Sequence, residues 1–185
     1  AYEDLRRESA RVLSQMKSEK MFDGFGIGGS FTKDDIGTAV KWVTEELNKN
    51  GAEEKPRHLL GIGEPVDIFL GVENGIDTFD CVSPTRIGRN GRIYTKDGPI
   101  NILNNKYKKD MTPVCDDETC YAHKYTKSYL QHLFRSKEML AATIASTHNL
   151  HFIVSLTKDI RQSILKDNFF EFKKEFLGRY YKKQY

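Results

Sequence analysis

A short apolar stretch that runs into a Gly-Ile-Gly sequence occurs twice in the first half of the chain, at residues 22–29 and 57–63. Each is followed by a segment with the helical spacing of apolar residues, and a third apolar stretch occupies residues 77–83. Strands and helices that alternate at this spacing predict βα units and a parallel sheet. Active-site groups in such folds lie at the carboxyl ends of the strands, so the residues that end these stretches are the first candidates for function.

The rest of the pattern is mainly helical. Thr32 with Asp35 is typical of a helix start, and Pro65 suits the first turn of a helix. The periodicity predicts helices over residues 2–17, 32–47, 65–74, 125–140 and 149–166, and a β-hairpin over residues 92–103. The last apolar stripe, around Phe172 and Phe176, is expected to pack in the core.

The third apolar stretch brings Asp80 to the rim of the predicted sheet. It is followed by phosphate-binding side chains, Arg86, Arg89 and Asn90, in a region whose basic residues extend to Lys109. A carboxylate at a strand end beside such groups indicates a nucleophile placed next to a nucleic-acid backbone. A lone aspartate at a strand end could instead serve as a structural cap or an ion-pair partner.

The glycines after the first two strands have more than one interpretation. The sequence Gly24-x-Gly26-x-x-Gly29 matches the dinucleotide fingerprint of an oxidoreductase, but the next helix begins several residues too late, and the second strand ends in Gly61-Ile62-Gly63 without an acidic residue to hold a ribose. Glycines also let main-chain groups approach a flat ligand. A purine-like base recognised by Gly28, Gly29 and Gly61 is therefore the preferred prediction. Tight turns without a ligand are the alternative.

A second group of candidate residues has the composition of a metal site. Cys115, Cys120 and His123 lie close together in the sequence, and His148 stands at a predicted helix start. Thiolates and neutral imidazoles suit tetrahedral zinc, and four protein ligands would make the site structural. The alternative is that these residues are neighbours in sequence only. Cys81 is expected to pack on the face of its strand opposite to Asp80.

Composition sets wider limits. The 185 residues suffice for one domain with a core, and a net charge of +3 does not by itself demand a nucleic-acid partner. Three cysteines are too few for a disulfide framework. We find no apolar run near the roughly 20 residues of a membrane span and no signal-peptide pattern, so a cytoplasmic protein without a membrane partner is expected.

Several motifs resemble the tRNA-guanine transglycosylase family. The most specific is Phe79-Asp80-Cys81-Val82-x-Pro84-Thr85-Arg86-x-x-Arg89-Asn90-Gly91, which is similar to the catalytic signature of that family. The others are, in family order, Asp23-Gly24-Phe25-x-Ile27-Gly28-Gly29, Leu60-Gly61-Ile62-Gly63-x-Pro65, Asn101-Ile102-x-Asn104-x-Lys106-Tyr107, Tyr129-Leu130-x-His132-Leu133 and His148-Asn149-Leu150. They extend over almost the whole chain but correspond only to the carboxy-terminal half of a family member.

The resemblance implies an α/β fold, the carboxy-terminal part of a (β/α)8 TIM barrel with an inserted zinc-binding subdomain. Residues 1–91 would supply the last three strands of the barrel, with 77–83 as the catalytic strand. Residues 92–149 would form the hairpin and the zinc-binding subdomain. Residues 150–185 would form helices that pack back on the barrel.

The resemblance also implies a reaction and a set of site residues. A family member exchanges a guanine in tRNA for a 7-deazaguanine base, as a glycosyltransferase of the pentosyltransferase type. Asp80 matches the nucleophile that holds the ribose covalently while the bases exchange. Residues that match the base pocket are Gly28, Gly29, Leu60 and Gly61, and those that match the tRNA-facing positions are Arg86, Arg89 and Asn90.

Two departures from the family pattern affect these expectations. The family metal motif is Cys-x-Cys-x-x-Cys with a distant histidine, whereas here Glu118 and His123 stand around Cys120, or Asp117, Thr119 and Ala122 when the spacing is counted back from His148. One structural zinc ion bound by Cys115, Cys120, His123 and His148 is therefore a hypothesis of a rearranged site.

The second departure is the absence of the amino-terminal half, supplied in cis or in trans, so we expect the chain alone to have little activity. Partners implied are tRNA, guanine or a 7-deazaguanine base, and a second subunit in a homodimer or heterodimer. The alternative function is a non-catalytic tRNA-binding or scaffolding subunit. Retention of Asp80 favours the enzyme.

Overall fold

The computed structural model describes residues 2–16, 22–29 and 35–182. By its internal contacts the chain divides into two compact units, Ala1–Cys81 and Val82–Tyr185. The predicted helix start at Thr32 lies outside the described residues. The division into domains at residues 91 and 149 stays a prediction.

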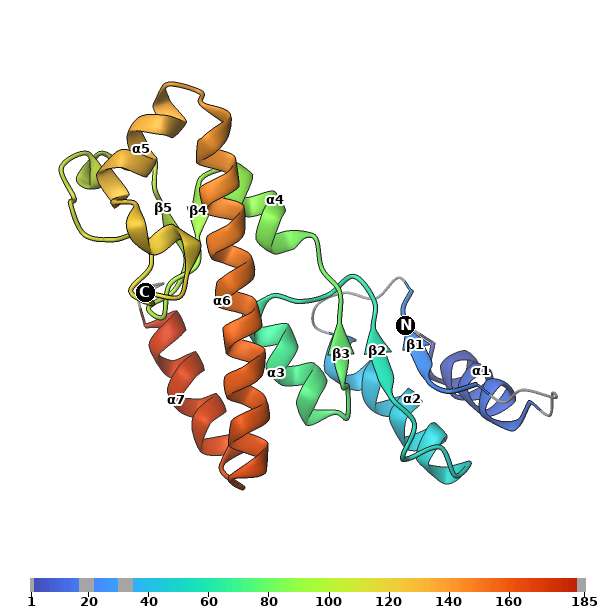
Figure 1. Ribbon diagram of the computed structural model, residues 1–185. Coiled ribbons are helices and arrows are strands. Elements are labelled where there is room, and N and C mark those ends of the chain that lie inside the picture. Colours follow the sequence, from blue (N-terminus) through green and yellow to red (C-terminus); the bar gives the residue numbers. More distant parts are fainter. Residues whose placement is uncertain (1, 17–21, 30–34, 183–185) are drawn as a thin grey trace. The chain divides into compact units, whose positions relative to one another are not determined.

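The first unit is built on a parallel sheet (Figure 1). Its strands, in the order β1-β2-β3, are β1 (Phe25–Ile27), β2 (Arg57–Leu59) and β3 (Thr78–Phe79). The helices of this unit are α1 (Glu3–Gln15), α2 (Ile36–Lys49) and α3 (Pro65–Glu73). Both strand pairs are parallel, with Ile27 paired to Leu59 and Leu59 to Phe79. The predicted βα alternation is confirmed.

The core of the first unit lies between the sheet and α2. Ile36 and Val40 stand one turn apart on α2 and are buried against Ile27, Leu59 and Ile76. Full burial of an aliphatic side chain of this size contributes about 1.5–3 kcal/mol to the free energy of unfolding. The four-residue spacing of the apolar positions on α2 therefore fixes which side of this helix faces the strands.

The third strand is shorter than the sequence indicated. It ends at Phe79, and Ser83 already begins the helix α4 (Ser83–Arg89). Pro84 lies in the first turn of this helix and not in an isolated turn. Proline is tolerated there because the amide groups of a first helical turn have no partner within the helix.

The second unit begins with α4 and consists mainly of helices. Its elements after α4 are β4 (Arg92–Ile93), β5 (Ile100–Asn101), the 3-10 turns η2 (Asn105–Tyr107) and η3 (Tyr121–Lys124), and the helices α5 (Lys127–Arg135), α6 (Met139–Leu165) and α7 (Phe169–Tyr181). The pair β4–β5 is antiparallel, which confirms the predicted hairpin. Contacts join α6 to α4, α5, η3 and α7, so α6 is the central element of this unit.

Helix α6 differs from the prediction. A helix was expected to end at residue 140 and another to begin at residue 149, but one helix runs from Met139 to Leu165. The buried residues Ala141, Ile144 and Ala145 belong to its first turns. Helix α4 approaches closely at Ala145: a Cβ atom added to Gly88 would lie 3.1 Å from the backbone of Ala145.

Asn149 connects α6 to two other elements of the second unit. Its side chain is fully buried, and its Oδ1 atom accepts a hydrogen bond from the Tyr94 amide at 2.9 Å. Its Nδ2 group donates to the carbonyl oxygens of Pro84 and Arg92, each at 2.9 Å. One amide side chain thus satisfies three backbone groups that would otherwise be buried without partners.

By length and composition alone, α6 meets the criteria for a helix that could cross a membrane. The expectation that no apolar run comes near the length of a membrane span does not hold for this segment. The helix also carries the buried polar residues His148 and Asn149 and packs against three other helices, α4, α5 and α7. These contacts bury part of the helix, whereas its apolar residues Leu150, Val154 and Leu165 are exposed.

Candidate active site and metal-binding cluster

The carboxyl ends of the three strands bring several predicted site residues to one edge of the sheet. Gly28 directly follows β1, Leu60 and Gly61 follow β2, and Asp80 follows β3. The Leu60 amide extends the β1–β2 ladder by donating to the carbonyl oxygen of Ile27 at 2.9 Å. The parallel register alone thus places residues from three distant parts of the chain side by side.

Asp80 presents an accessible carboxylate at this edge, with 60% of its side chain exposed. Its Oδ1 atom accepts a hydrogen bond from the Gly61 amide at 3.0 Å and lies 3.1 Å from Nε2 of His58. These two donors, Gly61 first and His58 second, hold the pKa of the Asp80 carboxyl below its usual range. The side chain is therefore an anion at neutral pH and can be reached by a substrate.

His58 was not among the predicted site residues. It belongs to β2, and its Nδ1 atom lies 2.8 Å from Oγ1 of Thr78 on β3. The register pairs His58 with Thr78, and strand alternation puts Thr78 and Asp80 on the same face. Pairing the two strands in register would have found this contact, because His58 is the cross-strand neighbour of Thr78 and its ring is long enough to reach the next residue on that face.

The predicted base-pocket residues follow β1 and β2 at the same edge of the sheet, and of these Gly61 contacts the carboxylate. A Cβ atom at Gly28 would come within 2.8 Å of the Leu60 Cδ1 atom, so only glycine fits against Leu60 as it stands. Gly61 has a φ of +72°, a conformation that glycine adopts without strain and that aims its amide at Asp80. Gly29 follows Gly28, whose carbonyl oxygen accepts a hydrogen bond from Arg6 at 3.1 Å.

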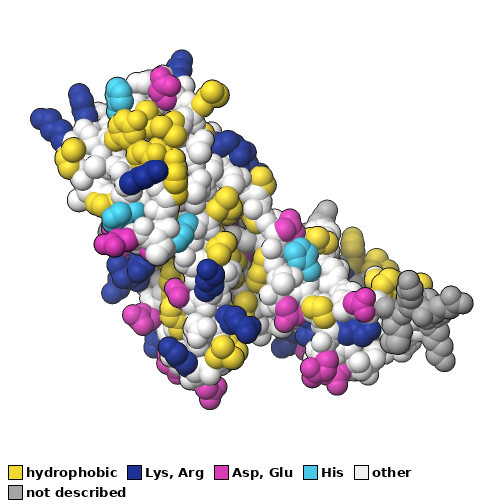
Figure 2. All heavy atoms as spheres, viewed as in Figure 1, with side chains coloured by type: hydrophobic (Ala, Val, Ile, Leu, Met, Phe, Trp, Pro, Cys, Tyr) yellow, Lys and Arg dark blue, Asp and Glu magenta, His cyan; other side chains and the backbone are white. Residues whose placement is uncertain are grey.

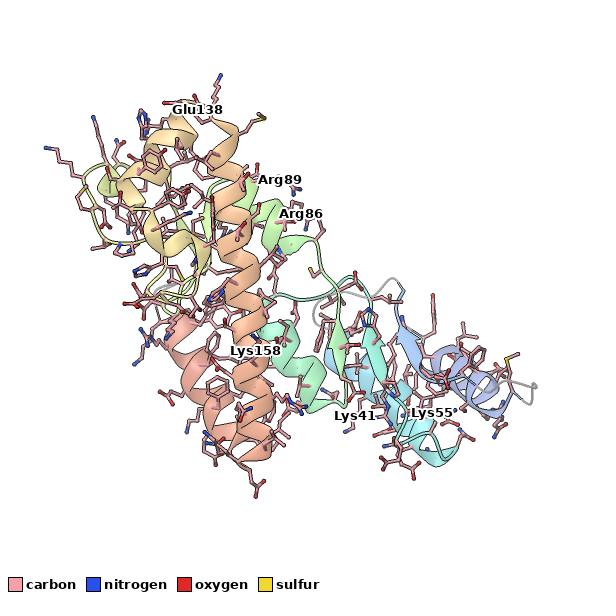
Figure 3. All side chains as sticks on the ribbon, viewed as in Figure 1. Lys41, Lys55, Arg86, Arg89, Glu138 and Lys158 are labelled. Carbon is pink, nitrogen blue, oxygen red and sulfur yellow. The ribbon has the colours of Figure 1, made fainter. Side chains whose placement is uncertain are left out.

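The predicted tRNA-binding residues belong to the second unit. Arg86 and Arg89 are exposed and lie on α4, one helical turn apart (Figure 3). Asn90 ends the helix, and its Nδ2 group donates to the carbonyl oxygen of Arg86 at 2.9 Å. The opposite side of α4 is buried at Gly88. The helix thus holds two guanidinium groups in solvent on a fixed support.

Three of the four predicted metal ligands come together in the second unit. Ligand atoms of Cys115, Cys120 and His148 lie within 4.8 Å of one another, and Nδ1 of His148 is 3.9 Å from the Cys120 sulfur. The Nε2 atom of His148 lies 2.8 Å from the Tyr94 carbonyl oxygen, to which it can only donate. The unprotonated Nδ1 atom therefore faces the thiols, as in a metal-ligating histidine held by a second partner.

The chemistry of these three donors fits zinc. Burial lowers the pKa of His148 and so favours the neutral imidazole that a metal requires. Burial also raises the pKa of the Cys115 thiol to about 12 when no cation is near. A divalent cation would offset that cost by binding the thiolates.

His123 lies outside this group. Its Nδ1 atom is 2.9 Å from the Cys115 carbonyl oxygen, and the predicted role of His123 as the fourth ligand stays a prediction. His148 is also not at a helix start as expected, but buried within α6.

Asp117 stands between the two cysteines of this group. Counted forward from Cys115, the sequence reads Cys115-x-Asp117-x-x-Cys120, which has the spacing Cys-x-Cys-x-x-Cys with an aspartate at the middle position. Oδ1 of Asp117 accepts from the Thr119 amide at 2.8 Å, and its Oδ2 lies 2.9 Å from Nε2 of His151. Hydrogen bonds from Thr119 and then from His151 lower the pKa of Asp117 to about 2.

A cluster of tyrosines stands near the metal-binding cluster in the sequence. The rings of Tyr125 and Tyr129 stack at 5.8 Å, Tyr121 meets Tyr125 edge-on at 5.6 Å, and Lys124 lies 4.1 Å from the centre of the Tyr121 ring. Figure 2 shows hydrophobic side chains gathered over the α5 region with Lys and Arg side chains around them. This surface was not predicted from the sequence.

Comparison with known proteins gives a consistent result. The family model described as queuine tRNA-ribosyltransferase matches residues 1–182. The chain is 42% identical over 183 residues to the queuine tRNA-ribosyltransferase of Fusobacterium nucleatum, covering 97% of this chain and 48% of that protein. The protein of the same name from Lactococcus lactis subsp. cremoris is 43% identical over 185 residues, covering 97% of this chain and 46% of the relative.

A third relative, from Helicobacter pylori and of the same name, is 43% identical over 175 residues, which cover 92% of this chain and 46% of that protein. The chain thus spans about half the length of the curated relatives it matches.

Proposed function

Because the chain belongs to the queuine tRNA-ribosyltransferase family, we propose that it is the catalytic, carboxy-terminal half of a tRNA-guanine transglycosylase. The observation that carries the proposal is the exposed Asp80 carboxylate at the sheet edge, beside Gly28, Leu60 and Gly61. This is a nucleophile next to a surface that a flat base can approach. The barrel that the family implies would be completed by the amino-terminal half.

The reaction that this site supports is a double displacement at C1′ of a guanosine in tRNA. A lone pair on the Asp80 carboxylate forms a bond to C1′ while the bond from C1′ to N9 of guanine breaks, and the departing guanine takes a proton at N9. In the second step, N9 of a 7-deazaguanine base bonds to C1′, the Asp80 carboxylate leaves with its electron pair, and the incoming base loses its N9 proton. Two easier steps thus replace one difficult displacement. The groups that move the N9 protons would belong to the amino-terminal half.

The target base must leave its stack in the tRNA to reach Asp80. We propose that main-chain groups of Gly28, Gly29 and Gly61 recognise the base and that Leu60, which is 49% exposed, covers one of its faces. Arg86, Arg89 and Asn90 would contact the phosphate backbone, as their exposure on a fixed helix suits them to do.

One structural zinc ion would be held by Cys115, Cys120 and His148, with His123 or Asp117 as the fourth ligand. When bound, zinc would tie the loop that carries both cysteines to helix α6 and would take no part in the displacement. The support for this assignment is the pair of thiols that faces the unprotonated nitrogen of a fixed, buried imidazole.

Further parts of the proposal concern the whole enzyme. The chain alone is expected to have little exchange activity, because base binding and proton transfer would be incomplete. A dimer of like or unlike subunits and a cytoplasmic location are what the family leads us to expect. Retention of Asp80 with both of its hydrogen bonds favours an enzyme over a non-catalytic tRNA-binding subunit.

The test is the covalent adduct with tRNA. The chain is joined to the amino-terminal half of a matched relative, incubated with tRNA, and analysed by denaturing electrophoresis. Asp80→Asn and Asp80→Ala should abolish the adduct, whereas Asp77→Asn, a change at the neighbouring aspartate outside the site, should retain it. An adduct that survives both substitutions at Asp80 would show that another residue is the nucleophile.

A further inference from the structure

The imidazole of His58 is held at both nitrogens by residues of the neighbouring strand. Nδ1 lies 2.8 Å from Thr78 Oγ1, and Nε2 lies 3.1 Å from Asp80 Oδ1. An ionised carboxylate can only accept, so Nε2 must carry a proton and donate it to Asp80. In the neutral ring Nδ1 then accepts from the Thr78 hydroxyl. A directed chain of hydrogen bonds thus runs from Thr78 through His58 to Asp80.

The two oxygens of the Asp80 carboxylate are not equivalent. Both donors, Nε2 of His58 and the Gly61 amide, bind Oδ1. Among the residues that the structure describes, none donates a hydrogen bond to Oδ2. One oxygen is therefore fixed by the protein and the other is open to a substrate.

We propose that His58 is a positioning residue that, together with the Gly61 amide, fixes Oδ1 of Asp80 and leaves Oδ2 as the atom that bonds to C1′. The inference rests on the proposed function, because it assigns a role within that reaction. It follows from the two contacts to Oδ1 and from the anchoring of the imidazole by Thr78. The ring itself need not touch the substrate.

This arrangement has a consequence for each step of the displacement. When Oδ2 bonds to C1′, the carboxylate becomes an ester, and Oδ1 becomes a carbonyl oxygen without the negative charge. A hydrogen bond to an anion is stronger than one to a neutral carbonyl, so His58 stabilises the free carboxylate more than the ester. His58 therefore favours release of the ribose from Asp80 and limits accumulation of the adduct.

Loss of the His58 hydrogen-bond donor should raise the ratio of adduct to free enzyme, whereas misfolding would not raise it. A loss of positioning slows formation and release of the adduct alike, whereas loss of anion stabilisation raises the ratio of adduct to free enzyme. For a solvent-exposed pair we expect a rise of about threefold to tenfold in this ratio. General damage to the site would lower the amount of adduct instead.

The first arm of the test is independent of activity. Long-range ¹H–¹⁵N NMR spectra of the 185-residue chain report the protonation of each ring nitrogen of His58. Asp80→Ala should change the Nε2 signal most, and Thr78→Val should change the Nδ1 signal most. If neither substitution moves the His58 signals, the hydrogen-bond chain does not exist and the proposal is overturned.

The second arm uses the chain joined to the amino-terminal half of a matched relative, with tRNA and guanine. His58→Phe keeps the ring shape and removes the donor, whereas His58→Gln keeps an amide donor. The adduct ratio should rise in the Phe variant, stay near the wild-type value in the Gln variant, and take an intermediate value in Thr78→Val. Equal ratios in the wild type and the Phe variant would overturn the proposal.

The two proposals fail in different ways. If the wild-type enzyme forms no adduct while the NMR contacts are present, the proposed function fails and the role of His58 in it fails with it. If the wild type forms an adduct that depends on Asp80 but not on His58, only the positioning role fails. Thr78→Val leaves the imidazole in place, so it tests the role even if His58→Phe does not fold.

Discussion

The Oδ2 atom of Asp117 lies 2.9 Å from Nε2 of His151, a residue one helical turn beyond the metal-cluster residue His148. Asp117, which stands at a cysteine position of the family motif, thus contacts His151 of α6. Zinc prefers thiolate or imidazole to carboxylate in structural sites. We therefore expect the proposed zinc site to bind the metal more weakly with aspartate at position 117 than it would with cysteine.

Asp117→Cys should consequently raise the affinity of the chain for zinc. The measurement is competition with a chelator, together with the near-ultraviolet band of the cobalt-substituted protein, which grows with the number of thiolate ligands. Glu118→Cys is the matched control, since it adds a cysteine at the next position along the loop. Equal gains from both substitutions would show that position 117 is not near the metal.

Asn149→Ala should destabilise the protein strongly. It leaves the Tyr94 amide and the carbonyl oxygens of Pro84 and Arg92 without their buried partner, at a cost of about 2–5 kcal/mol in the free energy of unfolding. Urea denaturation measures this cost. Asn101→Ala, which removes one exposed hydrogen bond to the Leu103 amide, should cost about 1 kcal/mol or less. Similar losses in the two variants would contradict the central role of Asn149.

Asp80 should titrate below the usual carboxyl range near pH 4. Because its folded pKa is lower than its unfolded one, its hydrogen bonds stabilise the fold above that range, and this contribution is lost as the pH falls through the lowered pKa. Carbonyl ¹³C NMR of the chain measures the titration. His58→Phe should bring the pKa of Asp80 part of the way back, because the Gly61 amide, the larger cause, remains. A full return to the usual value would mean that Gly61 contributes nothing.

Three glycines should respond differently to alanine. Gly88→Ala places a Cβ 3.1 Å from the backbone of Ala145 and should destabilise the packing of α4 on α6 by about 1–3 kcal/mol. Gly178→Ala, on α7 with open space around it, should stabilise the helix by about 0.5–1 kcal/mol. At Gly28 the added methyl group would lie 2.8 Å from Cδ1 and 3.3 Å from Cβ of Leu60, so Leu60 must shift and the KM for the base should rise. Thermal unfolding and base-exchange kinetics separate these outcomes.

Arg86→Ala and Arg89→Ala should weaken tRNA binding and reduce its dependence on salt. Removing one cation that neutralises a phosphate lowers the slope of log K against log salt by about 0.7–0.9. Binding is measured at several salt concentrations. Lys158→Ala, at an exposed cation of α6 (Figure 3), is the control and should leave the slope unchanged. If all three substitutions lower the slope equally, α4 does not bind the RNA specifically.

The strand ends could be predicted from sequence because the parallel arrangement needs no detailed geometry. Once the apolar stretches were recognised as parallel strands, Gly28, Gly61 and Asp80 had to share one edge. His58 could not be found in this way. Its role depends on the register between β2 and β3, which places it opposite Thr78 and within reach of Asp80.

The start of α6 could not be predicted for a different reason. Its first turns are buried by means of small residues, Ala141 and Ala145, and further along it buries the polar pair His148 and Asn149. Burial of polar and small side chains blurs the apolar stripe on which periodicity depends. The metal-site prediction was affected as well, because the distant histidine was expected at the end of an element and not within one.

Helix α6 carries, within one short segment, the contact with Gly88 of α4 at Ala145, the metal-cluster residue His148, and the hydrogen bonds of Asn149 to Pro84 and Arg92. The segment that carries Cys115 and Cys120 and the helix α4 thus both contact α6. We expect substitution of Cys115 or Cys120 to weaken the proposed phosphate contacts of α4, although neither cysteine is proposed to contact the RNA. If the proposed zinc site and the proposed tRNA contacts are both correct, removal of zinc by a chelator should weaken tRNA binding.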